Sequence, residues 1–135
     1  MKKVAIIGGG FGGLSAAKRL MGVADLEVSV FDQRNHHLFQ PLLYQVATAG
    51  LSPAEIAAPI RGLLADEDNA RVVLAKIDGI DLAAKRITAG DASWNYDFLV
   101  LACGATQSYF GHPEWEEHAP GLKTLEQATE IRRRI

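Results

Sequence analysis

The sequence predicts an α/β fold, in which parallel strands alternate with helices and a small antiparallel meander is inserted. A β-branched run at 4–7 meets a glycine cluster that opens a helix-like pattern, and a second strand pattern follows at 26–31. A continuous apolar run at 97–105 has the composition of a central parallel strand that is buried on both faces. With 135 residues, of which 48% are hydrophobic, the chain has the apolar content of one domain.

Charge and cysteine content exclude several classes of protein. The net charge of -2 gives no general attraction to nucleic acid or to an anionic membrane. Cys103 is the sole cysteine, so no disulfide can form within the chain. Lys2 and Lys3 precede an apolar run that stops after Ile7, which is too short for a signal peptide, and no run of about 18 apolar residues predicts a membrane span.

The first element is a strand at 3–7 that ends in a glycine-rich loop. Gly8, Gly10 and Gly13 occupy the fixed positions of the G-x-G-x-x-G motif, with Phe11 and Gly12 between them. Gly8 allows the tight turn, Gly10 lets the backbone approach a pyrophosphate, and Gly13 lets the helix lie close to the strand. The helix N-terminus then offers N–H groups to the phosphates. We therefore expect a dinucleotide site, and a glycine-rich turn without a ligand is the alternative.

A helix at 11–21 and a strand at 26–31 complete a right-handed β-α-β unit and a Rossmann-like fold. Small and apolar residues recur at spacings of three and four on one face of the helix, where they should pack on the sheet. Asp32 ends the second strand, 24 positions after Gly8. This spacing is typical of the acid that binds an adenosine ribose.

The segment 33–50 is too apolar for an ordinary exposed loop. We expect it to fold over a ligand or another domain, or alternatively to form a small satellite core. Pro41 can start a short helix that runs through Ala47. His36 and His37 do not have the spacing of a metal site, so we expect no metal, and His36 is the better candidate for a hydrogen-bond donor near a ribose or phosphate.

The remaining elements are shorter. A capping box at 52–55 starts a helix that Pro59 interrupts, a helical turn follows at 60–64, and a polar turn occupies 66–69. Strands are predicted at 71–80, 85–89 and 92–96, and the last two belong to a β-meander over about 79–97. The segment 106–120 is expected to be a loop.

The C-terminal residues predict a helix that does not end within the sequence. Thr124 and Gln127 have the spacing of a capping box, but no glycine, asparagine or proline terminates the helix before Ile135. We therefore interpret the chain as the N-terminal part of a longer protein, with a natural frayed terminus as the alternative.

These motifs together resemble a known family. The loop at 8–13, Asp32, and the strand with small residues at 96–105 are similar to the FAD motifs of pyridine-nucleotide disulfide oxidoreductase-like flavoproteins, although Cys103 replaces the usual threonine. The stretches 35–48 and 51–61 look like those of type II NADH dehydrogenases. The resemblance covers nearly the whole chain.

The resemblance implies the N-terminal part of an FAD-binding domain within a NADH:quinone oxidoreductase that does not pump protons. Hydride would pass from NADH to FAD, and two electrons would then pass to a quinone. The NADH-binding domain and the C-terminal membrane helices of the family are absent from residues 1–135. The implied FAD contacts are Gly8, Gly10, Phe11, Gly12, Gly13, Asp32, Gln33, Arg34, His36, Gln40, Pro41, Leu42, Leu43, Ile77, Ala102 and Gly104.

The resemblance also implies a location and partners. The full-length protein would be peripheral on the cytoplasmic face of a bacterial inner membrane, whereas the fragment would be soluble, inactive by itself and prone to self-association through an open sheet edge. The alternatives are a sulfide:quinone or related FAD reductase, and a nucleotide-binding module without catalysis. The disulfide reductases carry a Cys-x4-Cys pair after the first helix that this chain lacks, so we interpret Cys103 as a small hydrophobic residue.

Overall fold

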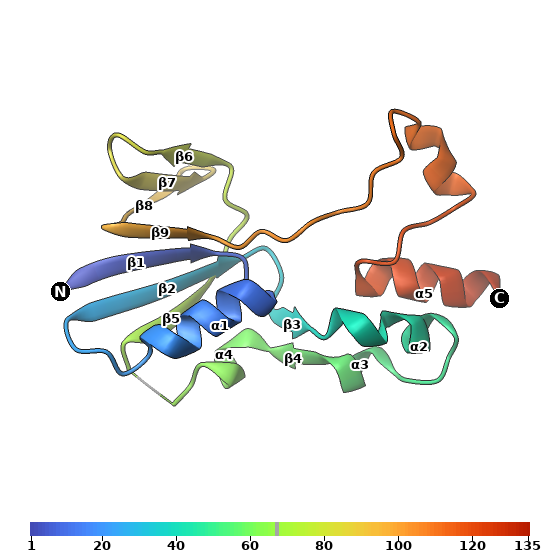
Figure 1. The fold of residues 1–135 in the computed structure, drawn as a ribbon, viewed down its shortest axis with the longest axis horizontal. Helices are drawn as coiled ribbons and strands as arrows, with labels where there is room; N and C mark the ends of the chain where they lie inside the picture. The colour runs from blue at the N-terminus through green and yellow to red at the C-terminus, as the bar shows by residue number, and fades with distance from the viewer. Residues whose placement is uncertain (67) are drawn as a thin grey trace. The chain divides into compact units, whose positions relative to one another are not determined.

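The computed structural model describes residues 1–66 and 68–135, and it divides the chain into two compact units. Unit 1 contains Met1–His37 and Pro59–Gly104, and unit 2 contains Leu38–Ala58 and Ala105–Ile135. The chain therefore leaves unit 1 twice, once after the second long strand and again after the last strand (Figure 1). Glu67, which belongs to the expected polar turn at 66–69, lies outside the described residues.

Unit 1 is built on the predicted parallel sheet. Among the described residues this sheet has the strand order β5-β2-β1-β9, and all of its neighbouring strands run parallel. The strands are β1 (Lys2–Ile7), β2 (Leu26–Asp32), β5 (Ala70–Leu74) and β9 (Phe98–Leu101). The register places Ile7 beside both Phe31 and Leu101, so the carboxyl ends of the three strands meet at one edge.

Helix α1 (Phe11–Leu20) packs on this sheet through the face that the sequence predicts. Gly13 and Ala17 are buried, and Leu14 is partly buried against the same core. Helix α4 (Ile60–Leu63) adds Ile60, which is fully buried. The buried cluster that joins these helices to the sheet contains Val4, Ile6, Ala17, Val28, Val30, Ile60 and Leu64.

The predicted meander is a three-stranded antiparallel sheet in the described part of the chain, with the order β6-β7-β8. Its strands are β6 (Gly79–Asp81), β7 (Arg86–Ala89) and β8 (Ala92–Asn95). A second buried cluster contains Ala5, Phe31, Ile87 and Tyr96. The meander therefore packs on the parallel sheet of unit 1 through apolar side chains, including an edge-on contact between the rings of Phe31 and Trp94 at 5.0 Å.

Two predictions about strands are wrong. The run 71–80 is not one strand: β5 ends at Leu74 and β6 begins at Gly79 in a different sheet. The Asp78 carboxylate fixes this change of sheet, because it accepts hydrogen bonds from the Thr88 hydroxyl at 2.9 Å and the Gly90 N–H at 2.7 Å. A run of β-formers does not reveal such a break.

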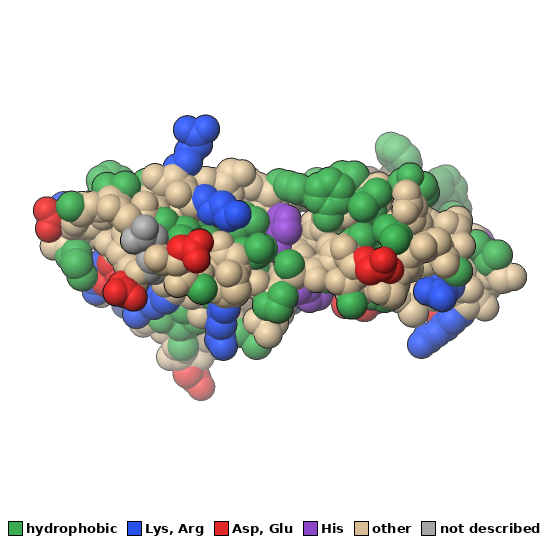
Figure 2. Space-filling view, turned by 90° about the horizontal axis from the view of Figure 1, so that it is seen from below, with side chains coloured by type: hydrophobic (Ala, Val, Ile, Leu, Met, Phe, Trp, Pro, Cys, Tyr) green, Lys and Arg blue, Asp and Glu red, His purple; other side chains and the backbone are tan. Residues whose placement is uncertain are grey.

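The second correction concerns β9, which was expected to be buried on both faces. Among the described residues it is an edge strand that pairs with β1 alone, so Phe98 is 58% exposed and Leu101 is 61% exposed. Two of its apolar side chains are therefore exposed to solvent instead of being buried by other elements. Hydrophobic side chains also reach the surface elsewhere, interspersed with acidic and basic ones, as Figure 2 shows for one face.

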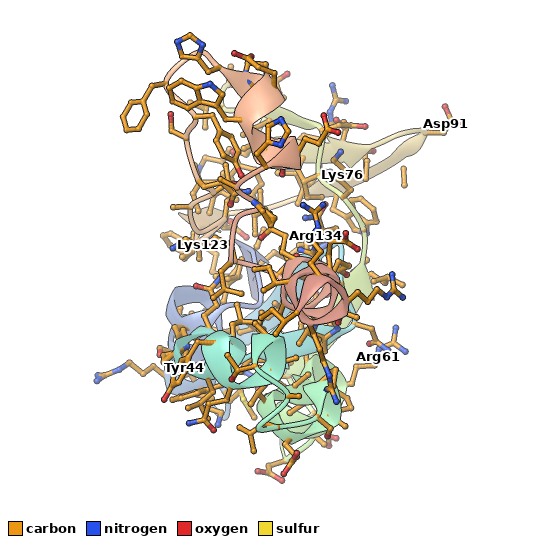
Figure 3. All side chains as sticks on the ribbon, turned by 90° about the vertical axis from the view of Figure 1, so that its right-hand side faces the viewer. Tyr44, Arg61, Lys76, Asp91, Lys123 and Arg134 are labelled. Carbon is orange, nitrogen blue, oxygen red and sulfur yellow. The ribbon has the colours of Figure 1, made fainter. Side chains whose placement is uncertain are left out.

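Unit 2 is mainly helical. Its first segment is flanked by β3 (His36–Leu38) and β4 (Ala57–Pro59), which pair as a two-stranded sheet. Its helices are η1 (Gln40–Leu42), α2 (Leu43–Ala47), α3 (Pro53–Ile56), η2 (Pro113–Glu117) and α5 (Leu125–Arg134). Helix α2 packs beside α5, and Figure 3 shows Tyr44 on the side of α2 that is turned away from α5. The buried cluster contains Leu43, Val46, Ala47, Ile56 and Ala128.

The caps of these helices explain where they begin. The Glu55 carboxylate accepts the Ser52 N–H at 2.6 Å, which confirms the capping box before α3. The Thr124 hydroxyl accepts the Gln127 N–H at 3.2 Å, as expected, but the Gln127 side chain accepts the N–H of Lys123 at 2.8 Å. The second arm of that box is therefore displaced by one residue.

Candidate cofactor-binding site

The glycine loop connects β1 to α1 at the carboxyl edge of the parallel sheet. The Gly8 N–H donates to the Phe31 carbonyl at 2.8 Å, and Gly8 has a φ of 103°, which favours glycine. A Cβ at Gly8 would collide with the Ala102 carbonyl, and a Cβ at Gly13 would collide with the Gly8 carbonyl. The fold itself therefore requires these two glycines.

Gly10 and Gly12 are different, because packing does not demand a glycine at either position. A Cβ at Gly10 would meet no heavy atom within 4 Å, and a Cβ at Gly12 would make an ordinary contact with Ala102 at 3.7 Å. Gly10 is the N-cap of α1, and within the described residues no side chain caps this end and no acid occupies the first turn. Open space and helix N–H groups thus meet at one point, where a pyrophosphate fits.

Asp32 lies beside this loop. One carboxylate oxygen accepts the Gly9 N–H at 2.6 Å, and the other accepts the Arg34 N–H at 2.7 Å. Each oxygen has a second lone pair, so the carboxylate retains capacity for the hydroxyls of a ribose. The prediction that Asp32 binds a ribose stays a prediction, with a second role now visible: the residue fixes the loop. Gln33 is exposed next to it.

Although the sequence favours His36 as the hydrogen-bond donor, His37 contacts the glycine loop. Its Nδ1 lies 3.0 Å from the Gly9 carbonyl oxygen, and its ring meets the Phe11 ring edge-on at 5.0 Å. A carbonyl only accepts, so this contact assigns the proton to Nδ1. The two adjacent histidines stand on a short strand, whose side chains alternate between faces. That alternation shows that only one of them can face the loop, but not which one.

Two further segments flank the same edge of the sheet. After β9, the Ala102 N–H donates to the Ile7 carbonyl at 2.8 Å, and Gly104 has a φ of 73°. After β5, the Ala75 N–H donates to the Asp32 carbonyl at 2.9 Å, which leads the chain to half-buried Ile77. The predicted contacts of unit 1 therefore gather at the carboxyl ends of β1, β2, β5 and β9.

Cys103 is exposed, which does not fit its interpretation as a packed hydrophobic residue. Its Sγ lies 3.9 Å from the Ile7 carbonyl oxygen. Cys103 follows β9, which pairs with β1 alone among the described residues.

The other predicted contacts, Gln40 to Leu43, belong to unit 2. The Gln40 amide donates to the Lys123 carbonyl at 3.3 Å. The helical turn η1 begins at Gln40, one residue before the expected start at Pro41, and α2 follows from Leu43 to Ala47. Leu43 is only 2% exposed within the cluster between α2 and α5, so its side chain is occupied by packing. Contacts of Gln40, Pro41 and Leu42 with a cofactor stay a prediction.

Across residues 1–66 and 68–135, no group of three or more His, Cys, Asp or Glu side chains is arranged to hold a metal ion. No helix in this part of the chain has both the length and the apolar character needed to cross a bilayer.

The chain is similar to known proteins over nearly its whole length. A model of the family described as pyridine nucleotide-disulphide oxidoreductase matches residues 2–135, and the chain therefore belongs to this family. It is similar to two type II NADH:quinone oxidoreductases of Mycobacterium tuberculosis, NdhA and Ndh, with 47% and 46% identity over 98% of this chain. It spans 29% of the length of each of these relatives.

Solved structures show the same fold. A sulfide:quinone oxidoreductase of Aquifex aeolicus is 29% identical, with a TM-score of 0.89 over 99% of this chain and 31% of its own. NDH2 of Plasmodium falciparum, in complex with NADH, is 24% identical, with a TM-score of 0.86 over 97% of this chain and 28% of its own. The Rossmann-like α/β fold expected from the sequence is thereby confirmed.

Proposed function

We propose that the chain is the N-terminal, FAD-binding part of a type II NADH:quinone oxidoreductase. The observation that carries this is the open position at Gly10, which is the N-cap of α1 and follows Gly9, the residue whose N–H donates to the Asp32 carboxylate. A Cβ there would project into space that the protein leaves free, which is where a dinucleotide pyrophosphate approaches. The identity of 47% to a protein with that name supports the choice of reaction.

In this proposal the protein residues bind and orient, because the electron transfer belongs to the cofactor. FAD, when bound, supplies the group that accepts hydride from NADH and releases two electrons to a quinone. The N–H groups at the start of α1 would donate hydrogen bonds to the pyrophosphate, and Asp32 would accept from the adenosine ribose. The backbone at Ile77 would contact the adenine. Ala102 and Gly104 are small, so the backbone after β9 can approach the middle of the cofactor.

The proposal extends to the parts of the reaction outside this chain. Residues 1–135 would form the N-terminal part of the FAD-binding domain, with the meander at about 79–97 as an insertion. A second dinucleotide motif for NADH, the quinone site and the attachment to the cytoplasmic face of the membrane would belong to the remaining length that the relatives possess. The fragment by itself would bind FAD without turning over NADH.

A second candidate is a sulfide:quinone oxidoreductase, favoured by the structural similarity to the Aquifex aeolicus enzyme. The two candidates share FAD and a quinone and differ in the electron donor. Full-length protein that reduces a soluble quinone with NADH supports the first, and reduction with sulfide but not NADH supports the second.

The test of cofactor binding uses two glycines with equal free space. Gly10→Val should weaken FAD binding at least about 100-fold, because its methyl groups occupy the place of the phosphate. Gly62→Val is the matched control, since a Cβ at Gly62 also meets nothing within 4 Å but lies on α4. Flavin fluorescence titration measures both, and equal FAD affinity of the two variants would contradict the proposed role of Gly10.

We also propose that the fragment self-associates through β9. The strand has an unpaired edge among the described residues, carries no charge or proline, and exposes Phe98 and Leu101. Light scattering at increasing concentration tests this, with Leu101→Lys expected to shift the population toward monomer. A wild-type chain that stays monomeric at high concentration would refute it.

A further inference from the structure

The backbone of Gly9 is held on both sides of its Cα, in the two peptide units that Gly9 joins. Its N–H donates to the Asp32 carboxylate at 2.6 Å, and its carbonyl lies 3.0 Å from Nδ1 of His37. Ile60 closes the side where a Cβ would stand. Three elements that are distant in sequence, β2, β3 and α4, thus converge on one glycine.

His37 also contacts the residue on the other side of Gly10. Its ring meets the Phe11 ring at 5.0 Å with an angle of 86° between the planes, and Phe11 is the first residue of α1. One imidazole therefore contacts both Gly9 and Phe11, which flank the open position at Gly10. Glycine-rich loops have many accessible conformations, so a contact on both sides of Gly10 selects among them.

We propose that His37 is a positioning residue for the dinucleotide: its Nδ1–H fixes the Gly9 carbonyl so that the N–H groups that follow face the pyrophosphate. The inference rests on the proposed function for its ligand, an adenosine pyrophosphate. A loop that is ordered before binding spares the ligand the entropy of ordering it. The hydrogen bond fixes the peptide plane, and the ring contact fixes the start of α1.

The test separates the donor from the ring. His37→Phe keeps an aromatic ring against Phe11 but removes the donor, whereas His37→Asn keeps an N–H near the place of Nδ1 and removes the ring. His118→Phe is the control, because His118 is an exposed histidine in unit 2. ADP serves as the probe in calorimetry, since it carries the pyrophosphate and the adenosine without the flavin.

His37→Phe should raise the dissociation constant of ADP about 10-fold, as loss of one hydrogen bond predicts, and His37→Asn should stay within about 3-fold of wild type. Amide exchange of Gly9 and Gly10 in the ligand-free chain should become about fivefold faster in His37→Phe alone. Unchanged ADP affinity and unchanged exchange in His37→Phe would overturn the inference. So would equal losses in both variants that follow a common fall in thermal stability, because that pattern indicates a purely structural role.

The exchange measurement needs no ligand, so it distinguishes the two proposals. If the wild-type chain binds neither FAD nor ADP, the proposed function fails. In that case faster exchange at Gly9 and Gly10 in His37→Phe still supports the positioning of the loop, and unchanged exchange refutes it.

Discussion

At each end of the parallel sheet, an aspartate carboxylate accepts a hydrogen bond from a backbone N–H, but the two contacts differ in what lies beside them. At the amino end, Asp97 accepts the Lys3 N–H at 2.8 Å and the Lys2 ammonium at 2.9 Å, which ties β1 to the start of β9. At the carboxyl end, Asp32 accepts the Gly9 N–H at 2.6 Å, which ties β2 to the loop after β1. Both acids fix a neighbouring backbone, but only the second lies beside the open position at Gly10.

This difference shows that a carboxylate–amide contact does not by itself mark a binding site. The position on the sheet decides, because ligands of open α/β sheets bind at the carboxyl ends of the strands. Substitutions at the amino end should therefore change the stability of the protein but not its affinity for FAD. Substitutions at the carboxyl end should change the stability at some positions and the affinity for FAD at others.

The largest effect is expected within the carboxyl end itself. Gly13→Ala places a Cβ against the Gly8 carbonyl and should lower the free energy of unfolding by about 3 kcal/mol or more. Gly12→Ala is the matched control on the same helix, because its Cβ makes an ordinary contact at 3.7 Å and alanine favours helix. Urea unfolding followed by circular dichroism measures both, and equal stabilities would refute the close packing inferred at Gly13.

The next effect compares the two acids directly. Asp32→Asn removes a charged acceptor at the loop and should weaken FAD binding by about 2 kcal/mol, or about 30-fold. Asp97→Asn makes the same chemical change at the opposite end and should leave FAD affinity within about twofold. A titration in which both variants lose affinity equally would remove the distinction between the two ends.

The contact of Asp97 at the amino end should make the stability of the protein depend on pH. Hydrogen bonds from the Lys2 ammonium and from the Lys3 N–H keep the pKa of the Asp97 carboxyl below its ordinary range. A carboxyl with a depressed pKa in the folded state stabilises the protein above its unfolded pKa, near 4, and this stability is lost as the pH falls through the folded pKa. Asp97→Asn should therefore be less stable than wild type at neutral pH, and its stability should fall less steeply below about pH 4.

The measurement is urea unfolding between neutral and acidic pH. Asp91→Asn is the control, since it removes the same charge from an exposed turn in the meander. A wild-type profile parallel to that of Asp97→Asn over the whole range would show that the contact with Lys2 and Lys3 does not matter in solution.

The smallest change in stability is expected at Tyr96, in the buried cluster that joins the parallel sheet to the meander. Tyr96 is 8% exposed, and its hydroxyl has no hydrogen-bond partner among the described residues. Tyr96→Phe should keep the packing and raise the stability by up to about 1 kcal/mol, because an unpaired buried hydroxyl is unfavourable. A loss of stability in thermal unfolding would indicate that the hydroxyl is paired in solution.

The sequence predicts the β1-loop-α1-β2 unit well, because its determinants are local. Gly8, Gly13 and the apolar face of α1 define the turn and the packing within about 20 residues, and the structure confirms them. The choice of Asp32 as the acid beside the loop also depends on local spacing, and Asp32 does contact the loop.

The remaining features depend on contacts that a local pattern does not contain. The exposure of β9 depends on which strands lie beside it, and the apolar run at 97–105 reads the same for an edge as for a central strand. The break between β5 and β6 depends on Asp78 reaching Thr88 and Gly90. Likewise, the orientation of β3 decides that His37 contacts the Gly9 carbonyl, and the positions of the two histidines in the sequence do not define this orientation.

The strand order also sets a sequence of events during synthesis. Lys2 pairs with Leu26, 24 positions along the chain, whereas Val4 pairs with Phe98, 94 positions along. Segments near the N-terminus fold first on the ribosome, and long loops close more slowly. We therefore expect β1 and β2 to associate early while the other edge of β1 waits for β9, so the nascent chain exposes that apolar edge to chaperones until about a hundred residues have emerged.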